Sequence, residues 1–242
     1  MNKWIAIVGF IWCALATAAP NSDKNTEDVF LAPGWGKLSF DAPAAGSYKL
    51  PALERAQGGQ VLDTDGEQQQ LDTYLGDKPT LLSFIYRTCD DVNGCPLSTS
   101  VLYTVAKRIG KEPDLQDQLR LITLSFDPLG DTPEAMTEYQ ESILGKADLD
   151  WAFLTTESET QLKPILNAYQ QSVVKDKTSE DGKGKFSHIL RVFLIDANKQ
   201  IRNIYSLSFL HPDILVNDIK TLILEQASSE QNNTALVDNT SK

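Results

Sequence analysis

The chain has 242 residues, of which 41% are hydrophobic, and this is enough for one compact domain with flexible extensions. Asp and Glu number 33 against 22 Lys and Arg, so the formal net charge is −11 and the phosphate backbone of a nucleic acid would be repelled. The 3 Cys, 2 His and 2 Met exclude a four-cysteine zinc site, a histidine cluster, a methionine-rich metal carrier and a dense disulfide framework.

Residues 1–18 are predicted to be a secretory signal peptide. Lys3 precedes an apolar run, and Ala16 and Ala18 stand at the −3 and −1 positions of an A-x-A cleavage site. An uncleaved membrane anchor is the alternative, but the run is shorter than the ~20 residues that span a bilayer comfortably. Cleavage would leave Cys89 and Cys95 as the cysteines of the mature chain, in an oxidising compartment where thiols normally pair.

Three further segments follow the signal peptide. Residues 19–58 carry scattered Pro, Gly and Ala and predict an extended arm that wraps the domain, with Trp35, Phe40 and Tyr48 as anchors. Residues 59–227 contain the periodic apolar segments of the folded domain. Residues 228–242 are polar and predict a disordered tail.

The first half of the domain reads as hairpin, strand, helix and strand. Asp65-Gly66 predicts a turn in a small hairpin, and its acidic residues do not have the spacing of a calcium loop. The continuous apolar run 80–86 predicts a buried strand. Helical spacing from Pro96 to Ile109 and an apolar run at 119–126 predict a helix and a second strand.

The second half continues the alternation. Pro133 predicts the start of a helix that ends near residue 144, and a strand at 151–154 precedes a helix with Thr156 and Glu159 as its capping box. Residues 189–196 and 201–207 predict an antiparallel pair of strands, and Pro212 starts the last helix. This order predicts an α/β, three-layer, thioredoxin-like fold with an N-terminal extension, an added hairpin and an inserted strand-helix segment.

The two cysteines flank the loop between the first buried strand and its helix, where open α/β sheets bind ligands. Cys95 precedes Pro96 and is a candidate N-cap, so the helix end is expected to favour its thiolate; Cys89 is expected to be the more exposed. Three chemistries are open to the pair: a structural disulfide, a redox dithiol, or a soft-metal site, for which copper is the first-row ion best suited to sulfur and imidazole.

A soft-metal site would need a further ligand, and the chain offers two histidines. His211 stands directly before Pro212 and is expected to have a capping or surface role. His188 follows a charged, glycine-containing loop and begins the predicted strand 189–196. Considered alone, His188 has the sequence context of a surface histidine. Together with the cysteine loop, it becomes the preferred third ligand.

Four motifs in this order resemble the Sco/SenC family: LLSFIYRTCDDVNGCP, SFDPLGDTPE, WAFLTT and HILRVFLID. The resemblance covers residues 60–226 and implies a thioredoxin-like copper protein that delivers copper to, or reduces the cysteines of, the copper centre of cytochrome c oxidase. It implies Cys89, Cys95 and His188 as copper ligands and Asp127 as an acidic neighbour. A periplasmic location is expected for such a protein.

The chain departs from the family pattern at two places. Five residues separate its cysteines where the family usually has three, and Ser187 stands before His188 where many relatives have Asp. A longer loop costs more to order, about 1 to 2 kcal/mol per added residue, which weakens metal binding or favours redox work.

The sequence is therefore consistent with two functions. The leading hypothesis is a periplasmic copper-binding assembly factor whose partner is the copper-receiving subunit of a respiratory oxidase or a similar cuproprotein. The alternative is a thiol-disulfide oxidoreductase that uses Cys89 and Cys95 to reduce the metal-site cysteines of a partner. A peroxidase lacks support, since the chain has no Thr-x-x-Cys signature before its cysteines.

Overall fold

The structure is a computed structural model that describes residues 29–176 and 186–240, with side chains described as far as residue 231. Residues 1–30 and 31–242 are separate units, and the helices and strands belong to the second. The predicted signal peptide, residues 1–18, lies outside the described residues. Within the described ranges, no helix combines the length and apolar character needed to cross a membrane.

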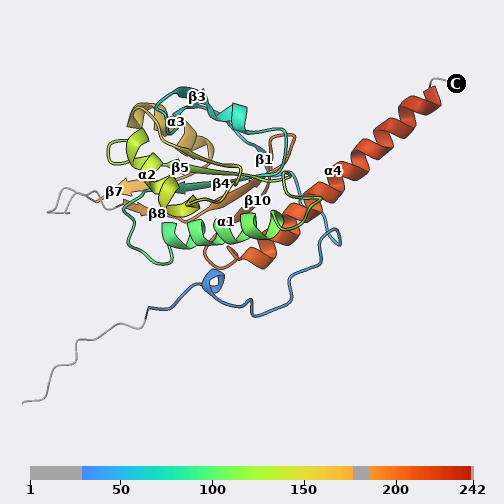
Figure 1. The fold of residues 1–242 in the computed structure, drawn as a ribbon, viewed down its shortest axis with the longest axis horizontal. Coiled ribbons are helices and arrows are strands. Elements are labelled where there is room, and N and C mark those ends of the chain that lie inside the picture. The colour runs from blue at the N-terminus through green and yellow to red at the C-terminus, as the bar shows by residue number, and fades with distance from the viewer. Residues whose placement is uncertain (1–28, 177–185, 241–242) are drawn as a thin grey trace, which may run out of the picture. The chain divides into compact units, whose positions relative to one another are not determined.

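A six-stranded sheet forms the centre of the domain (Figure 1). Its strands in spatial order are β1 (Glu54–Arg55), β10 (Gln200–Tyr205), β9 (Val192–Ile195), β4 (Thr80–Ile85), β5 (Arg120–Ser125) and β6 (Trp151–Leu154). Strands β4, β5 and β6 are parallel, whereas β9 is antiparallel to β4 and to β10. The predicted strands and the antiparallel β9–β10 pair are confirmed, with ends shifted by up to three residues.

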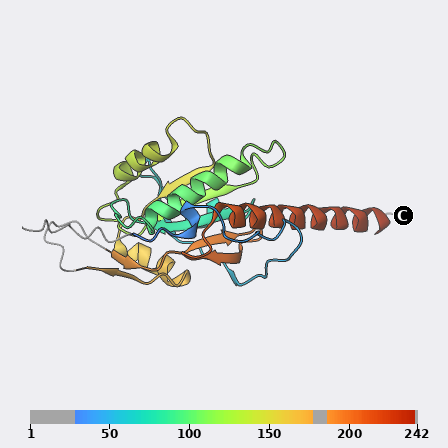
Figure 2. The same cartoon turned by 90° about the horizontal axis from the view of Figure 1, so that it is seen from below.

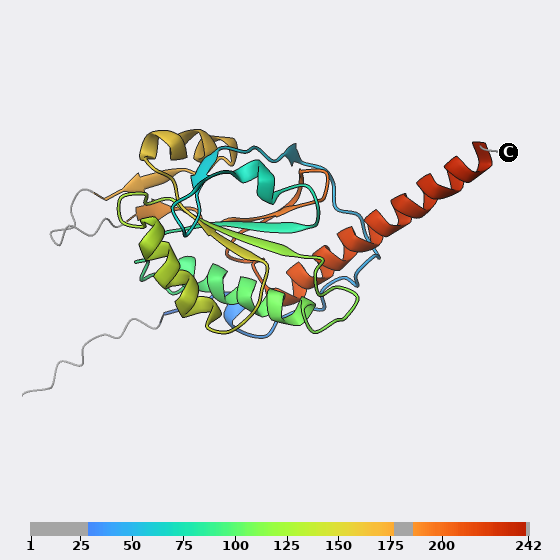
Figure 3. The same cartoon turned by 45° about the horizontal axis from the view of Figure 1, so that its top comes forward.

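Helices cover both faces of this sheet (Figure 3). The helices are α1 (Cys95–Ile109), α2 (Pro133–Leu144), α3 (Glu159–Ala168) and α4 (Pro212–Thr240). One core cluster joins the sheet to α1, α2 and α4; the other joins it to α3, to the hairpin of β2 (Gln60–Leu62) and β3 (Gln68–Gln70), and to the short 3-10 helix η2 (Leu71–Tyr74). The predicted α/β three-layer fold and the hairpin at Asp65-Gly66 are confirmed.

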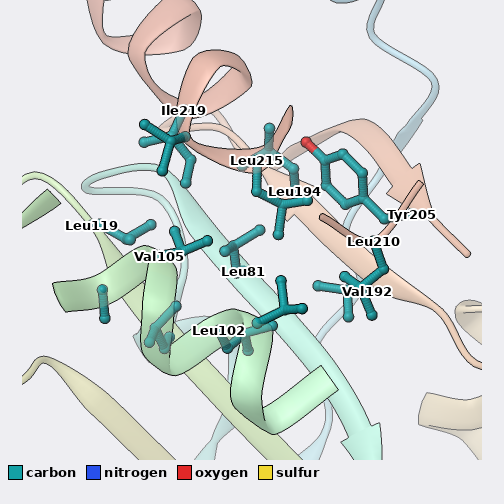
Figure 4. Close-up of a cluster of buried hydrophobic side chains, with 14 of the residues drawn as sticks. Leu81, Leu102, Val105, Leu119, Val192, Leu194, Tyr205, Leu210, Leu215 and Ile219 are labelled. Atoms are coloured by element: carbon teal, nitrogen blue, oxygen red, sulfur yellow. The ribbon is translucent and has the colours of Figure 1, made fainter. Parts of the chain in front are cut away.

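The alternation of side chains along β4 explains how one strand serves two cores. All six of its residues are buried, with Leu81 in the cluster under α1 and α4, and Leu82 and Phe84 in the cluster under α3. Figure 4 shows Leu81 among side chains from α1, from α4 and from β9. Burial of both faces by apolar residues fixes the register of the strand, because a one-residue slip would exchange the two faces.

Three predictions about elements need correction. The N-cap of α3 is Ser158 rather than Thr156: the Ser158 hydroxyl accepts a hydrogen bond from the Gln161 backbone N–H at 3.4 Å. Strand β8 (Phe186–His188) is separate from β9 and pairs with β7 (Val173–Lys175), so His188 ends a hairpin strand instead of beginning a core strand.

The third correction concerns residues 228–242, which were predicted to be a disordered tail. Helix α4 instead continues to Thr240. The segment contains no Pro or Gly that would break a helix. The hydroxyls of Ser228 and Ser229 donate hydrogen bonds to the carbonyls of Leu224 and Glu225 one turn earlier. The absence of an apolar face therefore did not end the helix.

From residue 31 onward, the N-terminal arm follows the surface of the domain (Figure 2). It contains a short 3-10 helix, η1 (Pro33–Trp35), and adds β1 to the edge of the sheet by pairing with β10. The Tyr48 hydroxyl donates to the buried Asp218, as expected for an anchor. Phe40 is 47% exposed, so it does not anchor the arm as predicted.

Candidate metal and thiol site

The candidate site lies at the carboxyl end of β4. Ile85 of β4 pairs with Ser125 of β5, so the loops that follow these two parallel strands leave the sheet side by side. The first loop contains Cys89, and the helix that it enters, α1, begins at Cys95. This is the position at which ligands bind in open α/β sheets, because strand ends and a helix N-terminus meet there.

The structure brings the three predicted ligands together. The Sγ of Cys95 lies 3.8 Å from the Nε2 of His188, although 93 positions separate them in the sequence. The Cys95 side chain is also hydrogen-bonded to the Cys89 sulfur. Both cysteines are free thiols. Among the described residues, no three His, Cys, Asp or Glu side chains are already arranged around a common point as metal ligands.

His188 reaches Cys95 because of the β7–β8 hairpin. Val173 of β7 pairs with His188 at the end of β8, and the imidazole packs against the Phe126 ring with centroids 4.7 Å apart. Burial lowers the pKa of His188, so the ring is neutral at physiological pH. A neutral imidazole is the form that binds metals.

The Cys89 sulfur is the centre of a group of hydrogen-bond donors. The side chain of Cys95, the backbone N–H groups of Cys95 and Asp91, and the Tyr86 hydroxyl all point to it. These donors, the Cys95 side chain first, lower the pKa of Cys89 to about 6 against the opposing effect of burial. Cys89 is therefore mainly a thiolate at neutral pH.

Cys95 has the opposite character to the one predicted from its helix position. Its hydrogen bond to Cys89 and its burial raise its pKa, so Cys95 holds the shared proton. Gly94, not Cys95, is the N-cap of α1. The helix end favours negative charge on both sulfurs. Cys89 is the one that carries the charge, because Cys89 is only partly buried and its thiolate loses less hydration than a thiolate at the buried Cys95 would.

Two features of the site had not been found in the sequence. Asp131, only 1% exposed, accepts hydrogen bonds from the Arg87 backbone N–H at 2.9 Å and the Ser125 hydroxyl at 2.6 Å. Burial raises its pKa, while these donors oppose the shift. The carboxylate thus ties the cysteine loop to the loop after β5. In the sequence, the one indication of a role for Asp131 is its position at the end of the SFDPLGD segment, beside the predicted site.

The second feature is an aromatic cluster on the His188 side. Tyr86, Phe126 and Phe186 pack around one another with ring centroids 5.0 to 5.5 Å apart. Phe126 adjoins the predicted Asp127, and Phe186 is two residues before His188. The cluster connects the two loops to the β7–β8 hairpin and therefore fixes the approach of the imidazole to the cysteines.

Asp127 lies where the resemblance placed it, in the loop after β5. Its backbone N–H donates to the Ser125 hydroxyl at 3.0 Å, and its carbonyl accepts from Gly130 and Asp131. These contacts describe a turn residue. Its role as an acidic neighbour of the metal ligands remains a prediction.

His211 has the capping role that was one of its two expected roles. Its Nδ1 accepts a hydrogen bond from the Asp213 backbone N–H at 3.1 Å at the start of α4, and its Nε2 donates to the carbonyl of Gly36 at 3.2 Å. The side chain is buried and engaged at both ring nitrogens, so it contributes to structure.

Cys89 is open to solvent on two sides. A cavity of about 450 Å³ lies toward His188 and is bordered by Ile189 and Leu207. A second, more apolar cavity of about 400 Å³ lies between α1 and α2 and is bordered by Tyr103 and Tyr139. A ligand or partner can therefore reach the Cys89 sulfur on the imidazole side or on the helix side.

The comparisons with known proteins agree with the fold. The SCO1/SenC family model matches residues 56–224. ScoI of Arabidopsis thaliana, solved with copper bound, aligns with a TM-score of 0.60 and 20% identity over 70% of this chain and 98% of its own. ScoI of Bradyrhizobium japonicum, also solved with copper bound, aligns with a TM-score of 0.57 and 25% identity over 69% of this chain and 99% of its own.

A third solved structure is BsSco, described as a member of the Sco family of cytochrome c oxidase assembly proteins with a disulfide switch. It aligns with a TM-score of 0.55 and 21% identity over 72% of this chain and 96% of its own. No curated protein matches the sequence. The family model covers strands β4, β5, β6, β9 and β10 of the sheet together with Cys89, Cys95 and His188, and the chain therefore belongs to the SCO1/SenC family.

Proposed function

We propose that this chain is a periplasmic copper-binding assembly factor that delivers copper to, or matures, the copper centre of a respiratory oxidase. The observation that carries the proposal is the 3.8 Å approach of His188 Nε2 to Cys95 Sγ, beside the hydrogen-bonded Cys89. Solved relatives of the same fold carry copper, and one is described as an oxidase assembly protein.

The donor set fits copper. Cys89 and Cys95 would supply two thiolates and His188 a neutral imidazole, ligands that copper accepts in either oxidation state. With Cu(I) the net charge at the site is −1 and with Cu(II) it is 0, so neither ion leaves a large charge in this partly buried place. Cys95 must lose its proton on binding, and metal uptake therefore releases protons.

Delivery would proceed by ligand exchange with a partner that has a similar thiolate site. Cys89, reached from two cavities, is the ligand that an incoming group can replace first. The net charge of −11 suits a partner surface with basic residues. Asp127 is proposed as an acidic neighbour of the ligands.

Copper titration of the reduced full chain tests the ligand set. We expect one equivalent of tightly bound copper, with thiolate-to-Cu(II) charge-transfer absorption. His188→Ala should weaken copper binding by at least about tenfold, because a ligand is lost. Ser187→Ala, an exposed neighbour on the same strand, is the matched control and should bind like the parent. Equal affinity of the parent and His188→Ala would overturn this ligand assignment.

Delivery is tested separately, by mixing the copper-loaded chain with a metal-free oxidase subunit. Transfer of copper to the subunit is expected, and retention of copper by this chain would contradict delivery.

A thiol-disulfide oxidoreductase is the second candidate, because the low pKa of Cys89 favours it. The Cys89 thiolate would attack a partner disulfide and release one partner thiolate; Cys95, after losing its proton, would then attack the mixed disulfide. The products are a Cys89–Cys95 disulfide and a fully reduced partner. His188→Ala should leave this single turnover intact, whereas Cys89→Ser should abolish it. Loss of reduction in His188→Ala would exclude a reaction that needs the cysteines alone.

A further inference from the structure

The loop between the cysteines is held from outside by part of the N-terminal arm. We call residues 32–36 of this arm the clamp segment. The Ala32 backbone N–H donates to the Oδ1 of Asn93 at 2.8 Å, and the Trp35 Nε1 donates to the carbonyl of Val92 at 3.1 Å. Both acceptors lie in the middle of the loop, between Cys89 and Cys95.

The clamp segment is itself seated on the rigid part of the domain. A Cβ at Gly34 would collide with the carbonyl oxygen of Leu210 and would lie 3.0 Å from Leu97 Cδ1 in α1. The carbonyl of Gly36 accepts the hydrogen bond from His211 at the start of α4. The segment therefore connects the loop to both helices, and α1 begins at Cys95.

The internal hydrogen bonds of the loop fix a turn but do not attach it to the core. The Asp91 carboxylate accepts from the Asn93 backbone N–H at 3.0 Å, and the Asp91 carbonyl accepts from the Gly94 N–H at 2.8 Å. Asp131 holds the first end of the loop, at Arg87. The clamp segment holds its middle, which reduces the entropy that a five-residue connection would otherwise lose on binding a ligand.

We propose that the clamp segment positions the cysteine loop, and that Asn93 and Trp35 are positioning residues that keep Cys89 beside the buried Cys95 and near His188. The expected effect on copper binding rests on the proposed function, whereas the expected effect on the conformation of the loop does not. The family model begins at residue 56, so the clamp segment lies outside the matched region.

Two glycines of the clamp segment provide a matched pair of variants. Gly34→Ala should push the segment away from Leu210 and α1 without changing any residue of the loop. A Cβ at Gly36 would meet a single atom at 3.9 Å, so Gly36→Ala is the control. In the metal-free full chain, we expect Gly34→Ala to speed hydrogen exchange of amides 91–94 about tenfold. Alkylation of Cys95, 2% exposed in the parent, should also be several-fold faster.

Asn93 provides a second pair of variants, in which the substitution is made in the loop and not in the arm. Asn93→Ala removes the acceptor for Ala32 and should reproduce the effects of Gly34→Ala, while Asn93→Asp keeps an acceptor oxygen and should restore parent behaviour. With copper added, Asn93→Ala should bind several-fold more weakly, with a shifted charge-transfer band, since the sulfurs are no longer held in one geometry. If Gly34→Ala fails to fold, Asn93→Ala and Asn93→Asp still test whether the clamp segment positions the loop.

Parent-like hydrogen exchange and Cys95 alkylation in Asn93→Ala would overturn the proposal. Equal effects of Asn93→Ala and Asn93→Asp would also overturn it, because the acceptor would then have no role. Exchange and alkylation are measured without metal, so failure of the clamp is visible there. Failure of the proposed function appears instead as absence of tight copper binding by the parent chain.

Discussion

At the scale of single residues, the site is defined by how two similar sulfurs are made different. Cys89 collects hydrogen bonds from four groups and has a pKa of about 6, while Cys95 keeps the proton that the two share. Sequence position alone suggested the reverse, because the helix N-terminus is visible in the sequence. The Tyr86 hydroxyl and the burial of Cys95 arise from packing and are not visible there.

The role of Tyr86 can be measured by Tyr86→Phe. Loss of the hydroxyl removes a donor to the Cys89 thiolate, so the pKa of Cys89 should rise from about 6, while the ring keeps its packing against Phe126 and Phe186. The pH profile of Cys89 alkylation should shift upward by less than about one unit. Tyr74→Phe, beside Arg120, is the control and should leave the profile unchanged. An unshifted profile in Tyr86→Phe would show that its hydroxyl does not stabilise the thiolate.

At the scale of elements, helical periodicity and apolar runs predicted the strands and helices that carry the site. β4 and α1 were recognisable because burial demands apolar residues at the spacing of each structure. The β7–β8 hairpin was not recognisable, since three-residue strands of mixed polarity have too few positions to show a period. His188 was therefore identified as a ligand candidate, but its strand was assigned incorrectly.

Helix α4 buries one face in the core and leaves another face exposed. Ile219 is fully buried between α1 and the sheet, whereas Leu224 is 52% exposed. Ile219→Ala should lower the free energy of unfolding by about 2 to 5 kcal/mol, because it removes transfer energy and leaves a cavity. Leu224→Ala should cost much less. Urea denaturation measures both, and equal losses would contradict this division of the helix.

At the scale of the whole molecule, distant segments converge on one edge of the sheet. The arm and the loop after β5 contact the loop that follows β4, and the β7–β8 hairpin contacts Cys95, so the site depends on the assembled fold. Metal bound by ligands from such different segments should stabilise the folded state, since the unfolded chain cannot hold these ligands together.

Thermal unfolding with and without copper measures this stabilisation. At free copper about 100 times the dissociation constant, the folded state should gain about 2.7 kcal/mol, less any binding to the unfolded thiols. His188→Ala should lose most of the gain. A parent midpoint that copper does not raise would show that these ligands do not share one ion in the folded protein.

The sequence by itself determined the fold class, the position of both cysteines at a strand end, and His188 as the preferred histidine, because periodicity and residue type are local properties. Tertiary structure alone decided that Cys89 carries the charge, that the imidazole approaches Cys95, and which contacts hold the loop. Those properties depend on burial and on hydrogen bonds between segments as much as 93 positions apart, for which a linear pattern has no signal.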